Sequence, residues 1–365
     1  MPADCDLILL CWNELAHTRR CVESLLQHTD VPSRLLIVDN GSDQETADFL
    51  QRLRLADAAP LTPPGARIRP AGGIQEIRLL RNERNEGYAR GMNRGLRESS
   101  ARWVCLLNND IVVTAGWLRE MISVMENEPR LGILNPASNN FGMAAPEKGA
   151  ARRSGAARQQ GLVVRRPPAA AARRWIETNG CSGFCFLIRR SVLDQVGLFD
   201  EQFKRGYFED ADYSMRVRAA GYDCGIALGC YVSHVGGASF QRVSNRNEVF
   251  HQNEQRFYQK WPKPRPQRIA WILADFKGHS AAEIREQIRR VANDDHQVRI
   301  YHTRRTREAV PAHHRVVARE LPETLFYPAV LWHILTKKKK FHRIILCARP
   351  KIGRWLERLR AAECR

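Results

Sequence analysis

The chain has 365 residues, 44% of them hydrophobic and 27% charged, which is close to the composition of an average globular protein. This composition excludes a chain that is disordered throughout, and the length suits one large domain or two ordinary ones. Lysine and arginine outnumber aspartate and glutamate by 58 to 39, so the net charge is +19. Such an excess favours polyanionic partners: nucleic acid, an anionic membrane surface or phosphorylated small molecules.

Two further features of the composition bear on location. No stretch approaches the roughly 18 to 20 consecutive apolar residues of a membrane-spanning helix, and the N-terminus lacks the basic segment and cleavage site of a signal peptide. We therefore expect a cytoplasmic protein, either free or peripherally attached to the inner face of the cell membrane. The ten cysteines are scattered and form no CxxC pair, which predicts reduced and mostly buried thiols.

The first 110 residues alternate short apolar runs with amphipathic segments. Four runs have the length and composition of buried strands, at residues 7–12, 35–40, 76–82 and 103–110. Helices are expected over residues 18–28 and from a cap at Ser42 or Asp43 to Leu53. This alternation predicts an α/β fold with a mainly parallel sheet covered on both faces.

Polar residues follow each of these four strands, at positions 13–14, 39–42, 85–87 and 108–110. One polar strand end is an ordinary exit to solvent. Because the carboxyl ends of parallel strands meet at one edge of a sheet, where ligands bind, four polar ends predict a polar cleft.

Two stretches interrupt the pattern. Residues 56–73 are rich in Pro, Gly and Ala and predict a surface insertion. Residues 143–174 carry eight basic residues against one acidic residue and predict a mobile basic loop.

The pattern then resumes with a strand and helix within residues 183–197, a helix over 210–220 that ends at Gly221, and a strand over 226–234. A proline-rich linker begins near Pro262. Beyond it, residues 268–365 again alternate strand and helix, so we expect a small α/β second domain, or an extension of the first, of unknown role. The first domain would be residues 1–261, divided by the basic loop into parts at about 1–142 and about 175–261.

Three sets of residues have the chemistry of a site. Asp110 follows the fourth strand, where one carboxylate suffices for Mg²⁺ or Mn²⁺ if a diphosphate supplies further oxygens; the alternative is that residues 108–110 only cap the next element. Glu209 and Asp210, with Asp212 beside them, can raise one another's pKa toward the range of a general base, although acids are also favoured in a helix's first turn. His234 ends an apolar strand, where a lone histidine is either structural or a ligand.

Several motifs follow one another over about residues 5 to 260: CWNE, IVDNGSDQET, RNEGYARGMNRGL, LLNNDIVVTAGWL, CSGFCFLIRRSVLDQVGLFDEQFKRGYFEDADYSMRVRAAGY and SHVGGAS. In this order they resemble glycosyltransferase family 2, closest to the bacterial rhamnosyltransferase-like branch that builds surface polysaccharides. The resemblance implies the A-type nucleotide-sugar transferase fold, a Rossmann-like domain fused to an acceptor-binding half. It makes residues 1–142 the expected nucleotide-binding half and residues 175–261 the expected acceptor half. It also implies a hexosyl- or rhamnosyltransferase that uses a nucleoside-diphosphate sugar.

The resemblance assigns roles to individual positions. Residues 108–110 occupy the place of the family's DxD motif, with Asp110 as the ligand of Mg²⁺ or Mn²⁺ and His234 completing the metal site. Asp210 matches the general base, with Glu209 beside it. The nucleotide-sugar site would consist of Asn13, Asp39, Asn85, Gly87, Asn109 and Asp110.

One position departs from the family pattern. The first DxD residue is Asn108, which leaves less negative charge at the metal and implies weaker metal binding or greater reliance on His234 and the diphosphate. The mechanism implied is inverting transfer: Asp210 deprotonates an acceptor hydroxyl on a glycan or lipid-linked glycan while the metal neutralises the leaving diphosphate. The sequence leaves donor, acceptor, linkage and oligomeric state open.

Other classes of protein fit the sequence less well. A nucleotidyltransferase would carry a basic, Gly-rich loop after the first strand, where this chain has NELAH. A nucleic-acid- or membrane-binding protein on an inactive transferase fold is the alternative, but no recognition helix, zinc finger or RNP-like strand is present, so nucleic acid is not the expected partner.

A membrane surface fits a lipid-linked acceptor better. One helical face, which runs into the lysines at 337–340, could lie in an anionic interface; the alternative is that it packs in the core of the second domain. The face consists of Phe326, Val330, Leu331, Ile334 and Leu335.

Overall fold

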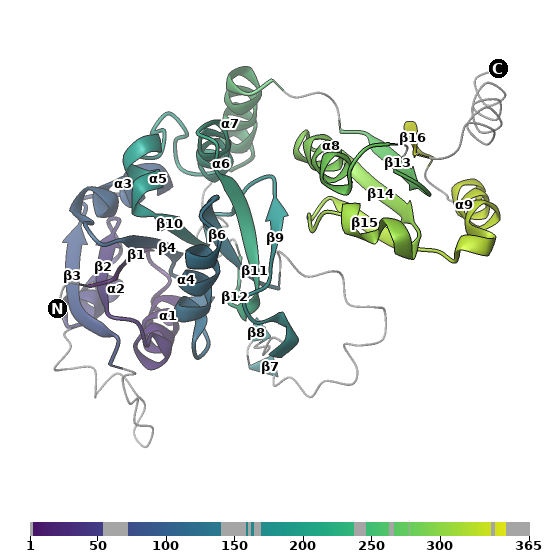
Figure 1. The fold of residues 1–365 in the computed structure, drawn as a ribbon. Coiled ribbons are helices and arrows are strands. Elements are labelled where there is room, and N and C mark those ends of the chain that lie inside the picture. The colour runs from purple at the N-terminus through teal and green to yellow at the C-terminus, as the bar shows by residue number, and fades with distance from the viewer. Residues whose placement is uncertain are drawn as a thin grey trace. The chain divides into compact units, whose positions relative to one another are not determined.

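The computed structural model describes most of the chain, in nine stretches (Figure 1). These are residues 3–53, 72–139, 158–159, 162–163, 169–236, 246–262, 266–276, 278–336 and 340–347. The predicted insertion at 56–73 lies almost wholly outside the described residues, as does most of the predicted basic loop at 143–174. A described fragment of that loop is a two-stranded hairpin of β7 (Arg158–Gln159) and β8 (Leu162–Val163).

The chain forms two compact units. The first contains Met1–Ile176 and Gly180–Pro262, and the second contains Glu177–Asn179 and Lys263–Arg365. Each unit has its own hydrophobic core.

An eight-stranded sheet organises the first unit, in the order β3-β2-β1-β4-β10-β6-β11-β9. The prediction of a mainly parallel α/β sheet is confirmed: β3, β2, β1 and β4 are parallel, as are β6 and β11, whereas β10 is antiparallel to both its neighbours. The strands are β1 (Cys5–Cys11), β2 (Ser33–Asp39), β3 (Ile74–Arg81), β4 (Trp103–Asn108), β6 (Leu131–Ala137), β9 (Trp175–Thr178), β10 (Cys185–Arg189) and β11 (Asp223–Tyr231).

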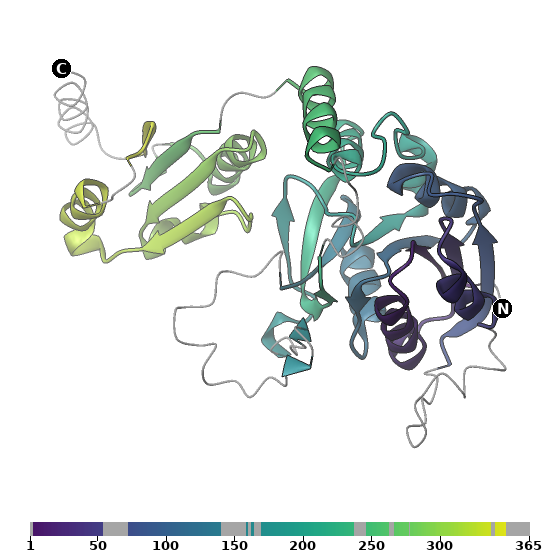
Figure 2. The same ribbon diagram turned by 180° about the vertical axis from the view of Figure 1, so that it is seen from behind.

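Helices cover both faces of this sheet (Figures 1 and 2). Alternate side chains of each strand point to opposite faces, so β1 sends Leu7 and Leu9 into one core cluster and Ile8 into another. The first cluster is closed by α1 (Leu15–His28), α2 (Gln44–Gln51) and α4 (Trp117–Asn127). The second is closed by α3 (Tyr88–Glu98), α5 (Arg190–Val196) and α6 (Glu209–Ala219).

Local signals explain several boundaries. Asp43 caps α2, since its Oδ1 accepts a hydrogen bond from the Thr46 backbone 3.0 Å away. Gly221 has φ of 89°, a left-handed conformation that ends α6 as predicted. One prediction needs correction: the strand expected over 226–234 is divided, because β11 ends at Tyr231. The last two residues form β12 (Ser233–His234), which pairs with β5 (Ile111–Val112) instead.

The first unit also contains α7 (Arg246–Lys260), which the sequence analysis did not predict. Among the helices that the structure describes, none has both the length and the apolar character needed to cross a bilayer. All nine cysteines in the described part of the chain are free, and eight of them are buried, in agreement with the prediction of reduced thiols.

The second unit is a small α/β sheet of four parallel strands in the order β15-β14-β13-β16. Its strands are β13 (Arg268–Leu273), β14 (Gln297–His302), β15 (Val316–Glu320) and β16 (Arg343–Cys347). The helix α8 (Ala281–Asn293) begins with a capping box between Ser280 and Glu283.

The helix α9 (Phe326–Leu335) also belongs to this unit. Its Phe326 and Val330 are buried in the core, and Ile334 packs against them. The face expected to enter a membrane is therefore largely a packing face, which corrects that prediction for these three residues.

Candidate active site

The loops after β1 and β2 are tied together at the carboxyl edge of the sheet. Asn13 has φ of 56° and Glu14 has φ of 54°, so the chain turns sharply as it leaves β1. The backbone of Asn13 donates to Ser42 Oγ at 2.9 Å, and Asn13 Oδ1 accepts from the backbone of Asp43 at 2.8 Å. The side chain of Asn13 thus has a clear role in fixing the first two polar strand ends against each other.

Asp39 is fully buried at the end of β2, and its two oxygens have different partners. Oδ1 accepts a hydrogen bond from the Ser42 backbone at 2.9 Å. Oδ2 forms an ion pair with the guanidinium of Arg81, the last residue of β3. A buried carboxylate is tolerated because it is paired in this way, and the pair joins neighbouring strands at the edge where the predicted cleft lies.

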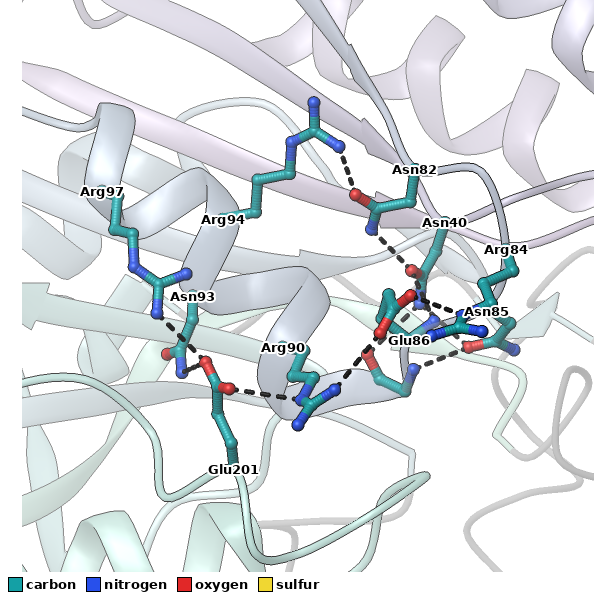
Figure 3. Close-up of polar contacts among 11 residues, drawn as sticks. Asn40, Asn82, Arg84, Asn85, Glu86, Arg90, Asn93, Arg94, Arg97 and Glu201 are labelled. Carbon is teal, nitrogen blue, oxygen red and sulfur yellow. Dashed lines mark hydrogen bonds and ion pairs between the residues drawn. The ribbon is translucent and has the colours of Figure 1, made fainter.

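The amide of Asn40 is the centre of a hydrogen-bond network between the ends of β2 and β3 (Figure 3). Its Nδ2 donates to Asn85 Oδ1 at 3.0 Å and to the carbonyl of Gly87 at 3.2 Å. Its Oδ1 accepts from Asn82 Nδ2 at 2.8 Å and from the backbone of Glu86 at 3.1 Å. This buried side chain therefore shapes the whole turn that precedes α3.

Two glycines let the backbone pass closely at this turn. Gly87 has φ of 85°, and a Cβ atom there would lie 2.8 Å from the backbone nitrogen of Arg205. Gly41 has φ of 73°, and its Cβ would lie 2.5 Å from backbone atoms of Arg84. A side chain at either position would both strain the backbone and push these loops apart.

Ion pairs and amide contacts link α3 to the loop that precedes α6 (Figure 3). Glu201 lies 3.2 Å from Arg90 and 3.1 Å from Arg97, and it accepts a hydrogen bond from Asn93 at 2.9 Å. Asn93 also pairs with the backbone of Phe199. The expected nucleotide-binding half and the expected acceptor half are thereby fastened to each other within the first unit.

Asn109 and Asp110 follow β4 but face different surroundings. Asn109 is buried, and its Nδ2 donates to Thr18 Oγ1 at 2.8 Å and to the carbonyl of Asn13 at 3.4 Å. Its amide thus holds the β1–α1 loop in place. Asp110 Oδ2 accepts from the backbone of Gly236 at 3.1 Å.

The other oxygen of Asp110 faces His234. Oδ1 lies 3.3 Å from His234 Nε2, and both atoms are buried without a hydrogen-bond partner among the described residues. The imidazole is held by stacking on Phe184, with ring centroids 4.8 Å apart, and by two hydrogen bonds between the backbone of His234 and the side chain of Asn139.

An oxygen and a nitrogen that face each other, neither with a hydrogen-bond partner among the described residues, fit as two ligands of a divalent cation. Adjacent ligands of an octahedral cation, each about 2.1 Å from it, lie about 3 Å apart, close to the observed separation of Oδ1 and Nε2. In the described part of the chain no cluster of three or more His, Cys, Asp or Glu side chains could hold a metal. Asp110 and His234 would therefore supply two ligands, and a bound diphosphate or water the others.

A short loop before β10 connects this pair to the acids of α6. Phe184 stacks on His234, and its carbonyl accepts from the backbone of Asn108 at 3.0 Å. The preceding residue, Gly183, donates its backbone N–H to Asp210 Oδ2 at 3.0 Å, and its carbonyl accepts from the Tyr88 hydroxyl at 2.6 Å. Two adjacent residues thus place Asp110, His234 and Asp210 around one loop.

The three acids in the first turn of α6 are not equivalent. Asp212 is fully buried and neutralised, because Lys260 and Arg216 form ion pairs with it and Trp261 donates to it. Asp210 is partly exposed, and only backbone N–H groups donate to its two oxygens in the contacts described. Glu209 is buried, and its Oε2 has no hydrogen-bond partner among the described residues.

Burial shifts the pKa of Glu209 and of Asp210 in the same direction. Burial raises the pKa of Glu209 well above its usual value, and the neighbouring Asp210 raises it further. Burial also raises the pKa of Asp210, while hydrogen bonds from the backbones of Gly183 and Ala211 oppose that shift. A carboxyl group with a raised pKa is a better proton acceptor once it is ionised, which suits a general base.

The structure therefore brings all the predicted site residues into two connected groups. The first lies at the ends of β1, β2 and β3, and the second surrounds the Gly183–Phe184 loop. Sequence reasoning gave no role to Asn40, Gly183 or Phe184. Asn40 follows a strand and could have been chosen on that signal, and Gly183 and Phe184 lie within the family-like motif CSGFCFLIRR without a role of their own.

Comparison with known families identifies the class of enzyme to which this geometry belongs. Residues 6–197 match the model described as glycosyl transferase family 2. That match covers more than half of the chain, so the chain belongs to glycosyltransferase family 2 and the protein is a glycosyltransferase.

Curated relatives agree with the rhamnosyltransferase-like branch. The chain is 27% identical over 233 residues to the N-acetylglucosaminyl-diphospho-decaprenol L-rhamnosyltransferase of Mycobacterium tuberculosis, covering 56% of this chain and 67% of the relative. It is 23% identical over 197 residues to the poly-beta-1,6-N-acetyl-D-glucosamine synthase of Staphylococcus epidermidis, covering 53% of this chain. That alignment spans only 42% of the synthase's length.

Solved structures show a more distant likeness. S. aureus TarS 1-349 in complex with UDP-GlcNAc has 13% sequence identity and a TM-score of 0.47, covering 70% of this chain and 66% of TarS. The mannosyltransferase PcManGT from Pyrobaculum calidifontis, in complex with GDP-Man and Mn²⁺, has 13% identity and a TM-score of 0.46. It covers 72% of this chain and 71% of PcManGT.

Proposed function

We propose that the protein is an inverting glycosyltransferase that moves a sugar from a nucleoside-diphosphate donor to a hydroxyl of a glycan or lipid-linked glycan. The observation that carries this proposal is the Gly183–Phe184 loop, which joins the Asp110–His234 pair to Asp210. A site for a charged leaving group thus adjoins a site for a proton acceptor. Substitution at an anomeric carbon by an acceptor hydroxyl requires both.

The donor would lie along the carboxyl ends of β1 to β4. Asp39 would contact the nucleotide base, with Asn13 beside it fixing the loop. Asn85 and Gly87 would lie near the nucleoside and sugar, and Asn109 would support Asp110 from the buried side. The fixed geometry of Asn40 and Arg81 favours this arrangement, because it preorganises these loops before a ligand arrives.

Asp110 and His234 would hold Mg²⁺ or Mn²⁺ in the proposed site. When bound, the cation would neutralise the charge that grows on the departing diphosphate. Asn108 contributes no charge, so we expect cation affinity to depend strongly on His234 and on the diphosphate itself.

Asp210 would act as the general base. As the acceptor oxygen forms its bond to the anomeric carbon, the bond from that carbon to the diphosphate oxygen breaks on the opposite side. The proton of the acceptor hydroxyl moves to Asp210. Burial and the neighbouring Asp210 raise the pKa of Glu209, and burial raises the pKa of Asp210, whereas Asp212 is already neutralised by Lys260 and Arg216.

We further propose that the acceptor is lipid-linked, as the name of the mycobacterial relative states for that enzyme. Such an enzyme would work at the inner face of the cell membrane, in synthesis of a surface polysaccharide. The observation that favours a membrane surface is a set of exposed apolar side chains at and near α9: Leu325, Trp332 and Leu335.

A thermal-shift screen tests the donor half of the proposal. UDP, GDP, dTDP and their sugars would be added with and without Mn²⁺. We expect metal-dependent stabilisation by one nucleotide, and we expect His234→Ala to lose the metal dependence. His251→Ala, an exposed histidine on α7, is the matched control. Absence of any nucleotide-dependent shift would contradict the proposal.

A further inference from the structure

A run of left-handed residues directly precedes the acids of α6. Arg205, Gly206, Tyr207 and Phe208 have φ of 62°, 119°, 72° and 71°, and Phe208 is the N-cap residue immediately before α6. Three of the four are not glycine, and left-handed backbone is unfavourable for side chains with a Cβ. Such a conformation persists only where surrounding groups fix it.

A single buried amide from α7 supplies much of that fixation. Asn253 Nδ2 lies 3.1 Å from the carbonyl of Lys204, 2.8 Å from that of Gly206 and 3.3 Å from that of Tyr207. Asn253 is buried, and so is its contact with the Gly206 carbonyl, so that carbonyl cannot replace the amide with bulk water. Its own Oδ1 accepts from Arg256, which also donates to the carbonyl of Gln202.

Other side chains at or near α7 contact the same region. Phe250 and Phe257 pack on Phe208, with ring centroids 5.2 Å and 5.4 Å apart. Lys260 and Trp261 contact Asp212 within the first turn of α6. Side chains at or near α7 therefore contact both the residue immediately before α6 and Asp212 within its first turn.

The segment 205–208 also contacts the turn before α3, in the expected nucleotide-binding half. The backbone of Arg205 approaches Gly87 so closely that only glycine fits there. The segment 205–208 is therefore held between the turn before α3 and the buried face of α7. A shift of this segment would move the start of α6, and with it the hydrogen bond between Gly183 and Asp210.

We propose that Asn253 is a positioning residue of the transferase site, which holds the left-handed segment 205–208 and so fixes Glu209 and Asp210 at the start of α6. This inference rests on the function proposed above for Asp210. Asn253 itself touches no reacting atom, and it acts through the backbone of the segment.

Hydrogen–deuterium exchange of the full chain tests the structural part. In Asn253→Ala, we expect backbone amides in residues 204–212 to exchange about tenfold faster or more, because three carbonyls lose this partner, that of Gly206 in a buried contact. The strands β1 to β4 should keep the exchange of the native protein. Gln252→Ala is the control on the neighbouring exposed position, where the side chain donates a hydrogen bond to Glu248 on the same helix. Unchanged exchange in residues 204–212 would overturn the proposal.

Steady-state kinetics tests the functional part. We expect Asn253→Ala to lower kcat about 10²-fold, since a small displacement of a catalytic group is enough for that loss. The KM for the donor should stay unchanged. Val249→Ala removes a buried apolar contact of the same helix and controls for loss of stability. An equal loss of kcat in Val249→Ala, at an equal loss of melting temperature, would overturn a positioning role.

The two tests also separate this inference from the proposed function. A native protein that binds no nucleoside diphosphate and transfers no sugar would contradict the proposed function. The exchange comparison would still show whether Asn253 holds the segment 205–208.

Discussion

Asp210 differs from its acidic neighbours in what surrounds it. It is partly exposed, and it accepts hydrogen bonds from the backbones of Gly183 and Ala211. Asp212, two residues later, is already engaged by Lys260, Arg216 and Trp261. Of these two aspartates, Asp210 is therefore the one able to receive a proton.

We predict that Asp210→Asn lowers kcat by about 10² to 10⁴, the usual contribution of a general base. The amide keeps the size of the side chain and can still accept from Gly183, so nucleotide binding should persist. The check is turnover together with nucleotide binding by thermal shift. Asp194→Asn, an exposed aspartate on α5, should leave both unchanged, and retained turnover in Asp210→Asn would refute the assignment.

Glu209 leads to a prediction about stability and pH. Burial raises its pKa in the folded state. A carboxyl with a raised folded pKa contributes stability below the unfolded pKa of about 4.3, and that contribution is lost as the pH rises through the folded pKa. Glu209→Gln cannot ionise, so the variant should gain stability relative to the native protein as the pH rises.

Urea unfolding of both proteins across this pH range measures the difference. Glu45→Gln, at an exposed position in α2, should show no such trend. If the free energies of unfolding of Glu209→Gln and the native protein differ by the same amount at every pH, burial does not raise the pKa of Glu209.

At the scale of single elements, the site depends on connections between the ends of strands and the helices that follow. Asn40 joins the end of β2 to the turn between β3 and α3 through four hydrogen bonds (Figure 3). Each of these contacts spans more than 40 residues of sequence, so they fix tertiary structure and not a local turn.

We predict that Asn40→Ala lowers the free energy of unfolding by about 2 to 3 kcal/mol, because it leaves several buried polar groups without partners. Nucleotide affinity should fall as well, since the loops after β2 and β3 lose their fixed geometry. Chemical denaturation and nucleotide titration measure the two effects. Asn127→Ala, at the exposed end of α4, is the matched control and should change neither quantity by a comparable amount.

The helix α9 presents a separate prediction. Its inner face packs in the core, but Trp332 is 68% exposed and Leu325 is 61% exposed. An aromatic side chain beside aliphatic ones is well suited to the interfacial region of a membrane. We predict that the native protein pellets with vesicles containing anionic lipid and that Trp332→Glu weakens this pelleting.

The control for that experiment is Tyr258→Glu, an exposed aromatic residue on α7. It adds the same charge without altering α9, so its pelleting should match that of the native protein. Equal pelleting of Trp332→Glu and the native protein would remove α9 from the proposed membrane contact.

At the scale of the whole molecule, the chain has two units with separate cores. The proposed nucleotide site lies entirely in the first unit. A ligand stabilises only the fold that binds it, by about 2.7 kcal/mol at 100 times its dissociation constant.

We predict two calorimetric transitions, of which a bound nucleoside diphosphate with Mn²⁺ raises only that of the first unit. Asn40→Ala identifies the transition of the first unit, and Ile288→Ala, in the core of α8, identifies the other. If the ligand raises only the temperature of the transition that Ile288→Ala lowers, the nucleotide binds the second unit. That result would contradict the proposed site.

The sequence itself determined much of this protein. Apolar periodicity and caps are local properties, so the four strands that end in polar residues were predictable, as was the alternation of strand and helix in the second unit. The polar ends of neighbouring parallel strands share one edge of a sheet, so the contacts among the residues that follow β1, β2 and β3 were predictable too. The motifs identified the family because they preserve chemistry in a fixed order.

Tertiary structure alone decided which of these groups meet. The strand β10 enters the sheet antiparallel between β4 and β6, which no local pattern specifies, and it brings Gly183 and Phe184 between His234 and Asp210. Helix α7, with its buried Asn253, contacts a segment about 46 to 49 residues away in sequence. Periodicity shows which face of an element is buried, but the partner of that face is set by packing of the whole chain.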